Sequence, residues 1–197
     1  MKEILIATGN AHKVEEFKEM LEPLGYTVKS MKDLERKIEI DETGTTFEEN
    51  SMIKAKTLHE ALGCAVMADD SGIMVDAMGG APGVYSARFM GEDTSYDIKN
   101  QYIMDQVAGK ERGAQYVCVI SYVEEDGTAT SYTGIVRGEI YDRQLGENGF
   151  GYDPIFYYPP YKTTLANVSD EMKHAISHRG IALRECVEYM KGKENHD

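Results

Sequence analysis

Residues 4–21, ILIATGNAHKVEEFKEML, join the two patterns that decide the fold. The apolar run from Ile4 to Thr8 predicts a buried strand, which Gly9-Asn10 ends. Apolar side chains then recur with the spacing of a helix that closes at Gly25: Val14, Phe17, Leu21 and Leu24. A strand followed directly by a helix is the unit from which α/β proteins are built.

The same alternation continues along the chain. A capping box at Thr46 predicts a helix, and we expect its buried stripe to consist of Phe47, Ala55, Leu58 and Leu62. Further strands are predicted at 26–31 and 64–68, helices at 96–107 and around 183–190, and a hairpin at 116–136. We therefore expect an α/β fold with a mixed β-sheet flanked by helices, as a single domain over residues 1–197 that ends in a frayed tail.

Composition narrows the classes of partner. The 197 residues hold 21 Lys and Arg against 34 Asp and Glu, a net charge of −13. This charge repels duplex nucleic acid and anionic membranes, because both require a basic surface. A small anion can still bind in a local basic pocket. Three cysteines without C-x-x-C spacing and the absence of an apolar run of ~18 residues favour a cytoplasmic protein.

Two predicted helices begin with cations, which the positive end of a helix disfavours unless an anion joins them. Asn10 caps a first turn that holds His12 and Lys13, and Ser177 caps one that holds His178 and Arg179. A phosphate at each helix start resolves the conflict. Alternatively, Lys13 is solvated on a turn, His178 packs against neighbouring side chains and Arg179 pairs with a carboxylate. Together the two starts favour an elongated anion such as a polyphosphate.

Carboxylates occur where an open α/β sheet binds ligands. Asp69-Asp70 ends the strand predicted at 64–68, and adjacent strand residues face opposite sides, so one of the two faces the site. Glu42 lies in a polar loop and offers a second oxygen ligand. Magnesium prefers few carboxylates together with phosphates and water, so two suffice. Lys54 either reaches a phosphate or covers Phe47 with its alkyl chain.

The segment from Asn148 to Pro154 contains Phe150 between two glycines. Its ring face is thereby open to stacking on a nucleobase, and Pro154 biases Asp153 to an extended conformation that presents a carboxylate. The alternative is an aromatic residue that packs in a core or an interface.

In their order along the chain, these motifs resemble those of the inosine triphosphate pyrophosphatases. The matching segments are TGNAHK at 8–13, ETG at 42–44, TFEEN at 46–50, DDSG at 69–72, GGAPGVYSAR at 79–88, GFGYDP at 149–154 and SHRG at 177–180. The resemblance implies an elongated fold of two lobes with a central substrate cleft, and a homodimer. It also implies magnesium-dependent hydrolysis of ITP, dITP and XTP to the monophosphate and pyrophosphate.

The resemblance further implies a role for each site residue. Asp70 is expected to be the catalytic base and, with Glu42, to hold Mg²⁺. Substrate contacts are expected from Thr8, Gly9, Asn10, Ala11, His12, Lys13, Lys54, Ser71, Arg88, Phe150, Gly151, Tyr152, Asp153, Lys173, His178 and Arg179. Two other functions remain open: a phosphohydrolase for other nucleotides, and a nucleotide sensor without turnover.

Overall fold

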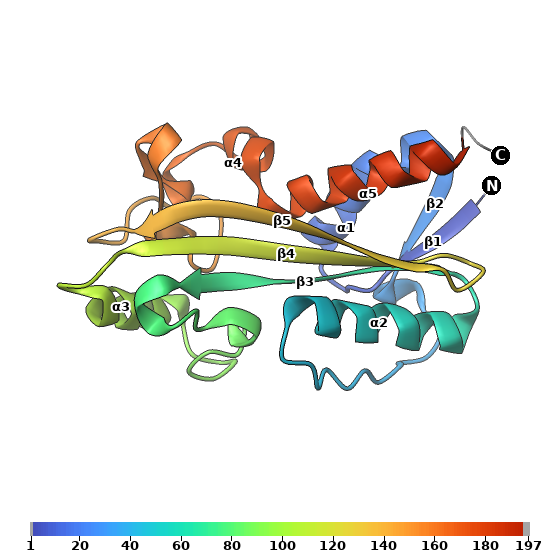
Figure 1. Ribbon diagram of the computed structural model, residues 1–197, viewed down its shortest axis with the longest axis horizontal. Coiled ribbons are helices and arrows are strands. Elements are labelled where there is room, and N and C mark those ends of the chain that lie inside the picture. Colours follow the sequence, from blue (N-terminus) through green and yellow to red (C-terminus); the bar gives the residue numbers. More distant parts are fainter. Residues whose placement is uncertain (1, 195–197) are drawn as a thin grey trace. The chain divides into compact units, whose positions relative to one another are not determined.

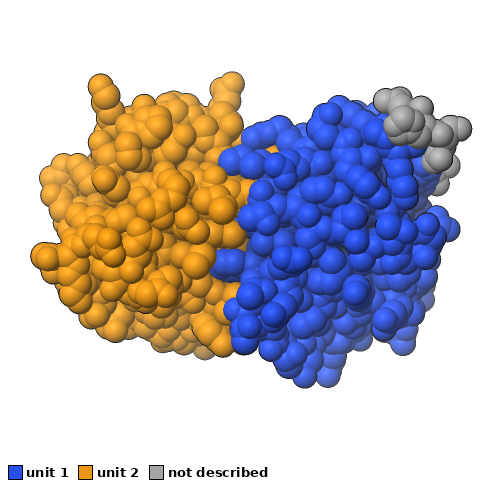
Figure 2. Space-filling model, viewed as in Figure 1, with its two compact units in different colours: residues 1–70, 118–133, 181–197 blue, residues 71–117, 134–180 orange. Residues whose placement is uncertain are grey.

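The computed structural model describes residues 2–194 (Figure 1). The chain forms two compact units, which Figure 2 shows in different colours. Unit 1 comprises residues 1–70, 118–133 and 181–197, and unit 2 comprises residues 71–117 and 134–180.

Within residues 2–194, seven strands form one sheet in the order β2-β1-β3-β4-β5-β6-β7. Their bounds are Lys2–Ile6 for β1, Tyr26–Ser30 for β2, Ala65–Val75 for β3, Gly113–Val123 for β4, Ala129–Ile140 for β5, Phe156–Tyr158 for β6 and Thr163–Thr164 for β7. Strand β1 pairs parallel with β2 and β3, whereas β6 pairs antiparallel with β5 and β7. The predicted α/β fold with a mixed sheet is confirmed.

In unit 1, helices cover both faces of the strands (Figure 1). Helices α1 (Ala11–Leu21) and α5 (His178–Glu194) pack on one face, and α2 (Phe47–Leu62) packs on the other. The side chains of each strand alternate between the two cores, as the pleat requires. Ile4, Ile6, Ala65 and Met67 lie in the core with α1 and α5, and Leu5, Val66 and Ala68 lie in the core with α2.

The caps of α1 and α2 follow from the sequence. The Asn10 side chain accepts from the N–H groups of His12 and Lys13, and Thr46 Oγ1 accepts from the N–H of Glu49. The capping box is only half formed, because the Glu49 carboxylate accepts from the N–H of Thr45 rather than Thr46. The predicted stripe of α2 is wrong at Leu62, which is exposed at the last position of the helix.

Unit 2 contains helices α3 (Tyr96–Val107) and α4 (Asp170–Ile176). Helix α3 has the predicted bounds, but α4 was not predicted. Its Ser169 cap accepts from the N–H of Met172, and Lys173 and His174 lie in its last turn. The Lys173 ammonium therefore lies at the negative end of a helix, where a cation is favoured.

Two further expectations, for the end of one strand and for the C-terminal tail, are compared with the structure here. Strand β3 does not end at Asp69 but continues through both aspartates to Val75. Of the expected frayed tail, residues 191–194 belong to α5, and residues 195–197 lie outside the described residues. In the described part of the chain, no helix has the length and apolar character needed to cross a membrane.

Candidate active site

Asp69 and Asp70 face opposite sides of β3. Asp69 continues the alternation of Ala65 and Met67 toward α1, and its Oδ2 lies 3.3 Å from Nζ of Lys13. The Asp69 side chain is 3% exposed, and the Lys13 ammonium compensates part of this buried charge. Asp70 continues the alternation of Val66 and Ala68 toward α2, where its carboxylate accepts from the side chain of Asn50.

The Asp70 carboxyl has a strongly raised pKa. Burial raises its pKa to about 6, and the charges of Glu42 and Asp69 add to the rise, whereas Lys54 and Asn50 lower it. Its Oδ2 is buried and has no hydrogen-bond partner among the described residues. A buried carboxylate oxygen without a partner is costly unless a ligand completes it.

Lys54 links two of the predicted motifs. Its Nζ donates to the main-chain carbonyl of Asp69 at 2.5 Å and lies 3.5 Å from Oε1 of Glu42. The Lys54 side chain is 17% exposed, whereas that of Glu42 is 40% exposed. Polar groups therefore hold the tip of Lys54 between the aspartate pair and the Glu42 loop, and its role is more than covering Phe47.

Asn50 also joins the Glu42 loop to Asp70. Its side chain is 2% exposed, and its Oδ1 accepts from the N–H of Gly44 at 2.8 Å. A Cβ on Gly44 would lie 2.7 Å from that Oδ1, closer than real contacts allow. Gly44 is thus required for the loop to approach α2 closely. Asn50 was not among the predicted site residues, although it lies on the same helical face as Lys54.

The segment 8–13 forms a tight, internally bonded start to α1. Thr8 Oγ1 accepts from the N–H of Asn10 at 3.1 Å, and Asn10 Oδ1 accepts from His12 and Lys13 at 3.0 and 3.3 Å. Gly9, Asn10, Ala11 and His12 are exposed. The first turn contains no acidic residue, as predicted. Contact of these residues with a phosphate stays a prediction.

Glu42 and Asp70 fit a magnesium ion by their chemistry. Both are hard oxygen donors, the charge of Glu42 raises the pKa of Asp70, and Asp70 keeps one buried oxygen without a partner within the described residues. The described residues contain no group of three or more His, Cys, Asp or Glu that could hold a metal by themselves. An ion here would therefore complete its coordination with substrate phosphates and water.

In unit 2, the carboxylate of Asp153 organises the predicted base-binding segment. It is 2% exposed. Its Oδ2 accepts from Nζ of Lys173 at 2.6 Å and from the N–H of Phe150 at 3.0 Å, and its Oδ1 accepts from Tyr116 Oη at 2.9 Å. The Phe150 ring is 67% exposed, with Lys173 Nζ 4.3 Å from its centroid. The ring is open, as the flanking glycines predicted.

The other predicted residues of unit 2 differ in their surroundings. Tyr152 is buried: its Oη donates to the Ser86 carbonyl, and its ring meets Tyr96 edge to face. Its side chain is thus packed within unit 2, and its contact with a substrate stays a prediction. Arg88 is exposed and lies over the Tyr85 ring at 5.5 Å. Ser71 and Gly151 are half-buried.

The second cationic helix start has the predicted cap. Ser177 Oγ accepts from the N–H of Gly180 at 3.0 Å, and the first turn of α5 contains no acidic residue. His178 stacks on Tyr116, with ring centroids 5.0 Å apart, and Arg179 is buried. His178 and Arg179 both have protein partners, so their contact with a substrate stays a prediction.

Comparison with known proteins decides the family. The model of the Ham1 family matches residues 4–189, nearly the whole chain. The chain belongs to the Ham1 family. Curated relatives are named dITP/XTP pyrophosphatases: that of Bacillus anthracis is 45% identical over 95% of this chain and 96% of its own. The dITP/XTP pyrophosphatase of Staphylococcus aureus is 42% identical over 99% of this chain and 100% of its own.

Solved Ham1 structures support the fold. The Staphylococcus aureus Ham1 protein superposes with a TM-score of 0.92 at 41% identity, covering 98% of this chain and 100% of its own. A HAM1 protein from Coxiella burnetii gives the same TM-score and coverage at 36% identity. The resemblance of the seven motifs to those of the inosine triphosphate pyrophosphatases is thus confirmed by the family match and by the names of the relatives.

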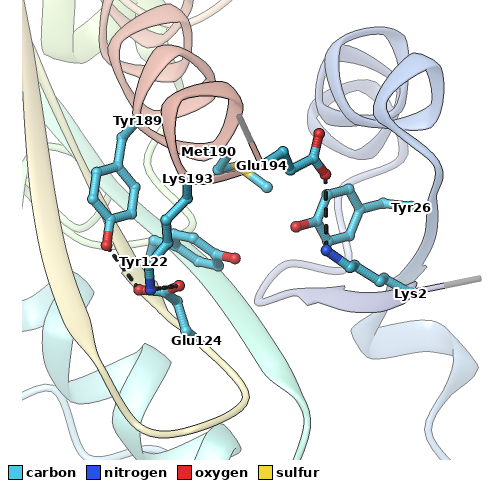
Figure 3. Close-up of a pocket in the computed structure, with 8 residues that line it drawn as sticks. All are labelled: Lys2, Tyr26, Tyr122, Glu124, Tyr189, Met190, Lys193 and Glu194. Carbon is cyan, nitrogen blue, oxygen red and sulfur yellow. Dashed lines mark hydrogen bonds and ion pairs between the residues drawn. The ribbon is translucent and has the colours of Figure 1, made fainter. Parts of the chain in front are cut away.

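A cavity of about 120 Å³ lies elsewhere in unit 1 of this Ham1-family chain (Figure 3). Glu124 accepts from Tyr189 Oη and from Nζ of Lys193 on its wall, and an ion pair joins Lys2 to Glu194. None of the predicted site residues lines it.

Proposed function

We propose that this chain hydrolyses ITP, dITP and XTP to the nucleoside monophosphate and pyrophosphate, with magnesium as cofactor, and thereby cleanses the nucleotide pool. Its class, nucleoside triphosphate pyrophosphatase, follows from membership of the Ham1 family and from the names of its relatives. The observation that carries the chemistry is Asp70, with a pKa raised to about 6 and a buried oxygen without a partner in the described chain.

Asp70 is proposed to accept the proton of the attacking water, or to orient it, during in-line attack on the α-phosphorus. A pKa near 6 makes it a better base than an ordinary aspartate, while leaving it ionised near neutral pH. Glu42 and Asp70 would hold the magnesium ion, which when bound supplies positive charge that neutralises the pyrophosphate leaving group.

Four cations and one backbone segment are proposed to bind the phosphates. Lys13 and Lys54 are each paired with a carboxylate, Asp69 and Glu42 respectively, which fixes their positions before substrate arrives. Such fixed cations stabilise charge that develops in the transition state without reorganising. Segment 8–13 is proposed to add backbone N–H groups, and Arg88 and Arg179 further positive charge.

Unit 2 is proposed to read the base. A purine would stack on the exposed Phe150 ring, which is worth ~1–3 kcal/mol per base. Lys173 keeps donors beyond the one it gives Asp153, and these suit the O6 acceptor of hypoxanthine and xanthine. Adenine presents an amino group there and would leave buried groups unpaired, which can discriminate by ~10⁴-fold.

The test is pyrophosphate release from ITP, XTP, GTP and ATP, each with and without magnesium. Fast magnesium-dependent release from ITP and XTP, with GTP and ATP far slower, is expected. Equal rates on all four would contradict base reading by Phe150 and Lys173 and favour a phosphohydrolase of other specificity. Binding of ITP without release would contradict catalysis and favour a sensor.

We further propose that the chain acts as a homodimer in the cytoplasm, as its resemblance to the inosine triphosphate pyrophosphatases implies. Light scattering coupled to gel filtration is expected to give twice the chain mass of 22.0 kDa. A mass equal to one chain at micromolar concentration would contradict the dimer.

A further inference from the structure

The Asp153 carboxylate is a buried charge that depends on its donors. Lys173 Nζ and the Phe150 N–H both bond to Oδ2, so Oδ1 depends on a different residue. That donor is Tyr116 Oη, at 2.9 Å. A buried carboxylate oxygen that loses its partner pays the full cost of its desolvation, which exceeds the net gain of an ordinary hydrogen bond.

Tyr116 lies on β4 and is itself immobilised. It is 7% exposed, and its ring lies nearly parallel to two others: Phe156 at 4.3 Å and 21°, and His178 at 5.0 Å and 15°. Burial and the charge of Asp153 raise its pKa well above the ordinary value for tyrosine, so the phenol stays a neutral donor. A fixed ring with a permanent donor is suited to orient a carboxylate.

We propose that Tyr116 is a positioning residue for base recognition, because its hydroxyl orients Asp153, and through it Lys173 and Phe150, while its ring supports His178. This inference rests on the proposed function, which assigns Phe150 and Lys173 to the base. Tyr116 itself does not contact substrate. Without the Tyr116 hydroxyl, Oδ1 of Asp153 loses its donor and the carboxylate is no longer held in this orientation, so Oδ2 no longer fixes the Lys173 ammonium and the Phe150 N–H in place.

The test removes one oxygen atom. Y116F keeps the stacked ring and deletes the bond to Asp153. Y189F is the matched control: Tyr189 Oη likewise donates to a carboxylate, Glu124, at 2.9 Å, in unit 1 (Figure 3). Values of kcat and KM for ITP and ATP are measured for both variants and for the wild type.

Y116F is expected to lower kcat/KM for ITP by ~10–100-fold, the loss of one charge-assisted hydrogen bond. The loss is expected in KM, with kcat changed less than about threefold, because the attacking groups belong to unit 1. ATP, whose adenine lacks the O6 acceptor for Lys173, is expected to change less than ITP. The preference for ITP over ATP therefore falls in Y116F and persists in Y189F.

A folded Y116F that keeps the wild-type preference overturns the proposal, as does a Y189F that loses the preference equally. A wild type without preference overturns the proposed function instead. Should Y116F unfold, the double variant Y116F/D153N decides, since the oxygen left unpaired is then uncharged. If Tyr116 acts through Asp153, this double variant has the same ITP preference as D153N alone; a further loss overturns the proposal.

Discussion

Three features make the ionised form of the Asp70 side chain costly: it is buried, it lies near other carboxylates, and one of its oxygens has no partner in the described chain. D70N keeps the shape but removes the base and the charge. We expect turnover of ITP to fall by ~10²-fold or more, with KM changed far less. Steady-state pyrophosphate release checks this. The control is E48Q, which is expected to be fully active. Glu48 is an exposed acid in the first turn of α2, the helix that holds Asn50. Unchanged turnover in D70N would remove Asp70 from the mechanism.

The raised pKa of Asp70 also has a consequence for stability. The folded protein holds this proton more tightly than the unfolded chain, because its pKa is about 6 against an ordinary 3.8. The stabilisation from this group is therefore complete below about pH 4 and is lost as the pH rises through about 6. D70N has no charge to bury, so without metal near neutral pH we expect it to be more stable than the wild type by about 1–3 kcal/mol. Urea unfolding between about pH 4 and 8 measures the difference, and a less stable D70N at neutral pH would contradict it.

At the scale of elements, the approach of the Glu42 loop to α2 depends on Gly44. A side chain there would lie 2.7 Å from Asn50 Oδ1 and from Glu49 Cβ. G44A should push the loop off the helix, displace Glu42 and free Asn50 from the Gly44 N–H. We expect the magnesium concentration for half-maximal activity to rise by ~10-fold, the usual cost of disturbing groups that orient metal ligands.

The readout for G44A is a magnesium titration of activity, together with calorimetric titration of magnesium into the nucleotide-free protein. G192A is the matched control, because Gly192 lies in α5 with open space around it, where alanine favours the helix. An unchanged magnesium dependence in G44A would show that the loop does not position a metal ligand.

Elements with a strong local signal were predictable. Helix α3 was placed to the residue, and the Asn10, Thr46 and Ser177 caps hold the N–H groups expected of them. The strand predicted at 64–68 is shorter than β3, because aspartates are uncommon in strands and Asp69-Asp70 therefore indicates its end. Its continuation depends on neighbours distant in sequence: it lies between β1 and β4 in the sheet, and Lys13 and Asn50 bind its carboxylates.

The candidate site was predictable as separate motifs but not as an assembly. The sequence indicated Glu42, Lys54 and Asp70 individually, and the fold brings them together through bonds of Lys54 and Asn50. Asn50 had a weak signal, its position four residues before Lys54 on one helical face. Tyr116 had none, since an aromatic residue within an apolar strand is typical of a core.

At the scale of the whole molecule, the net charge of −13 opposes a polyanionic substrate that local cations attract. At ~10 mM salt the Debye length is about 30 Å, so the entire protein repels the nucleotide. At about 150 mM it is about 8 Å, and only nearby groups such as Lys13 and Lys54 are felt. Above about 0.5 M these contacts are screened as well. We therefore expect kcat/KM for ITP to rise and then fall as KCl increases at constant free magnesium. A steady fall from the lowest salt would mean that local cations outweigh the net charge at every distance, and a steady rise would mean that they contribute little to binding.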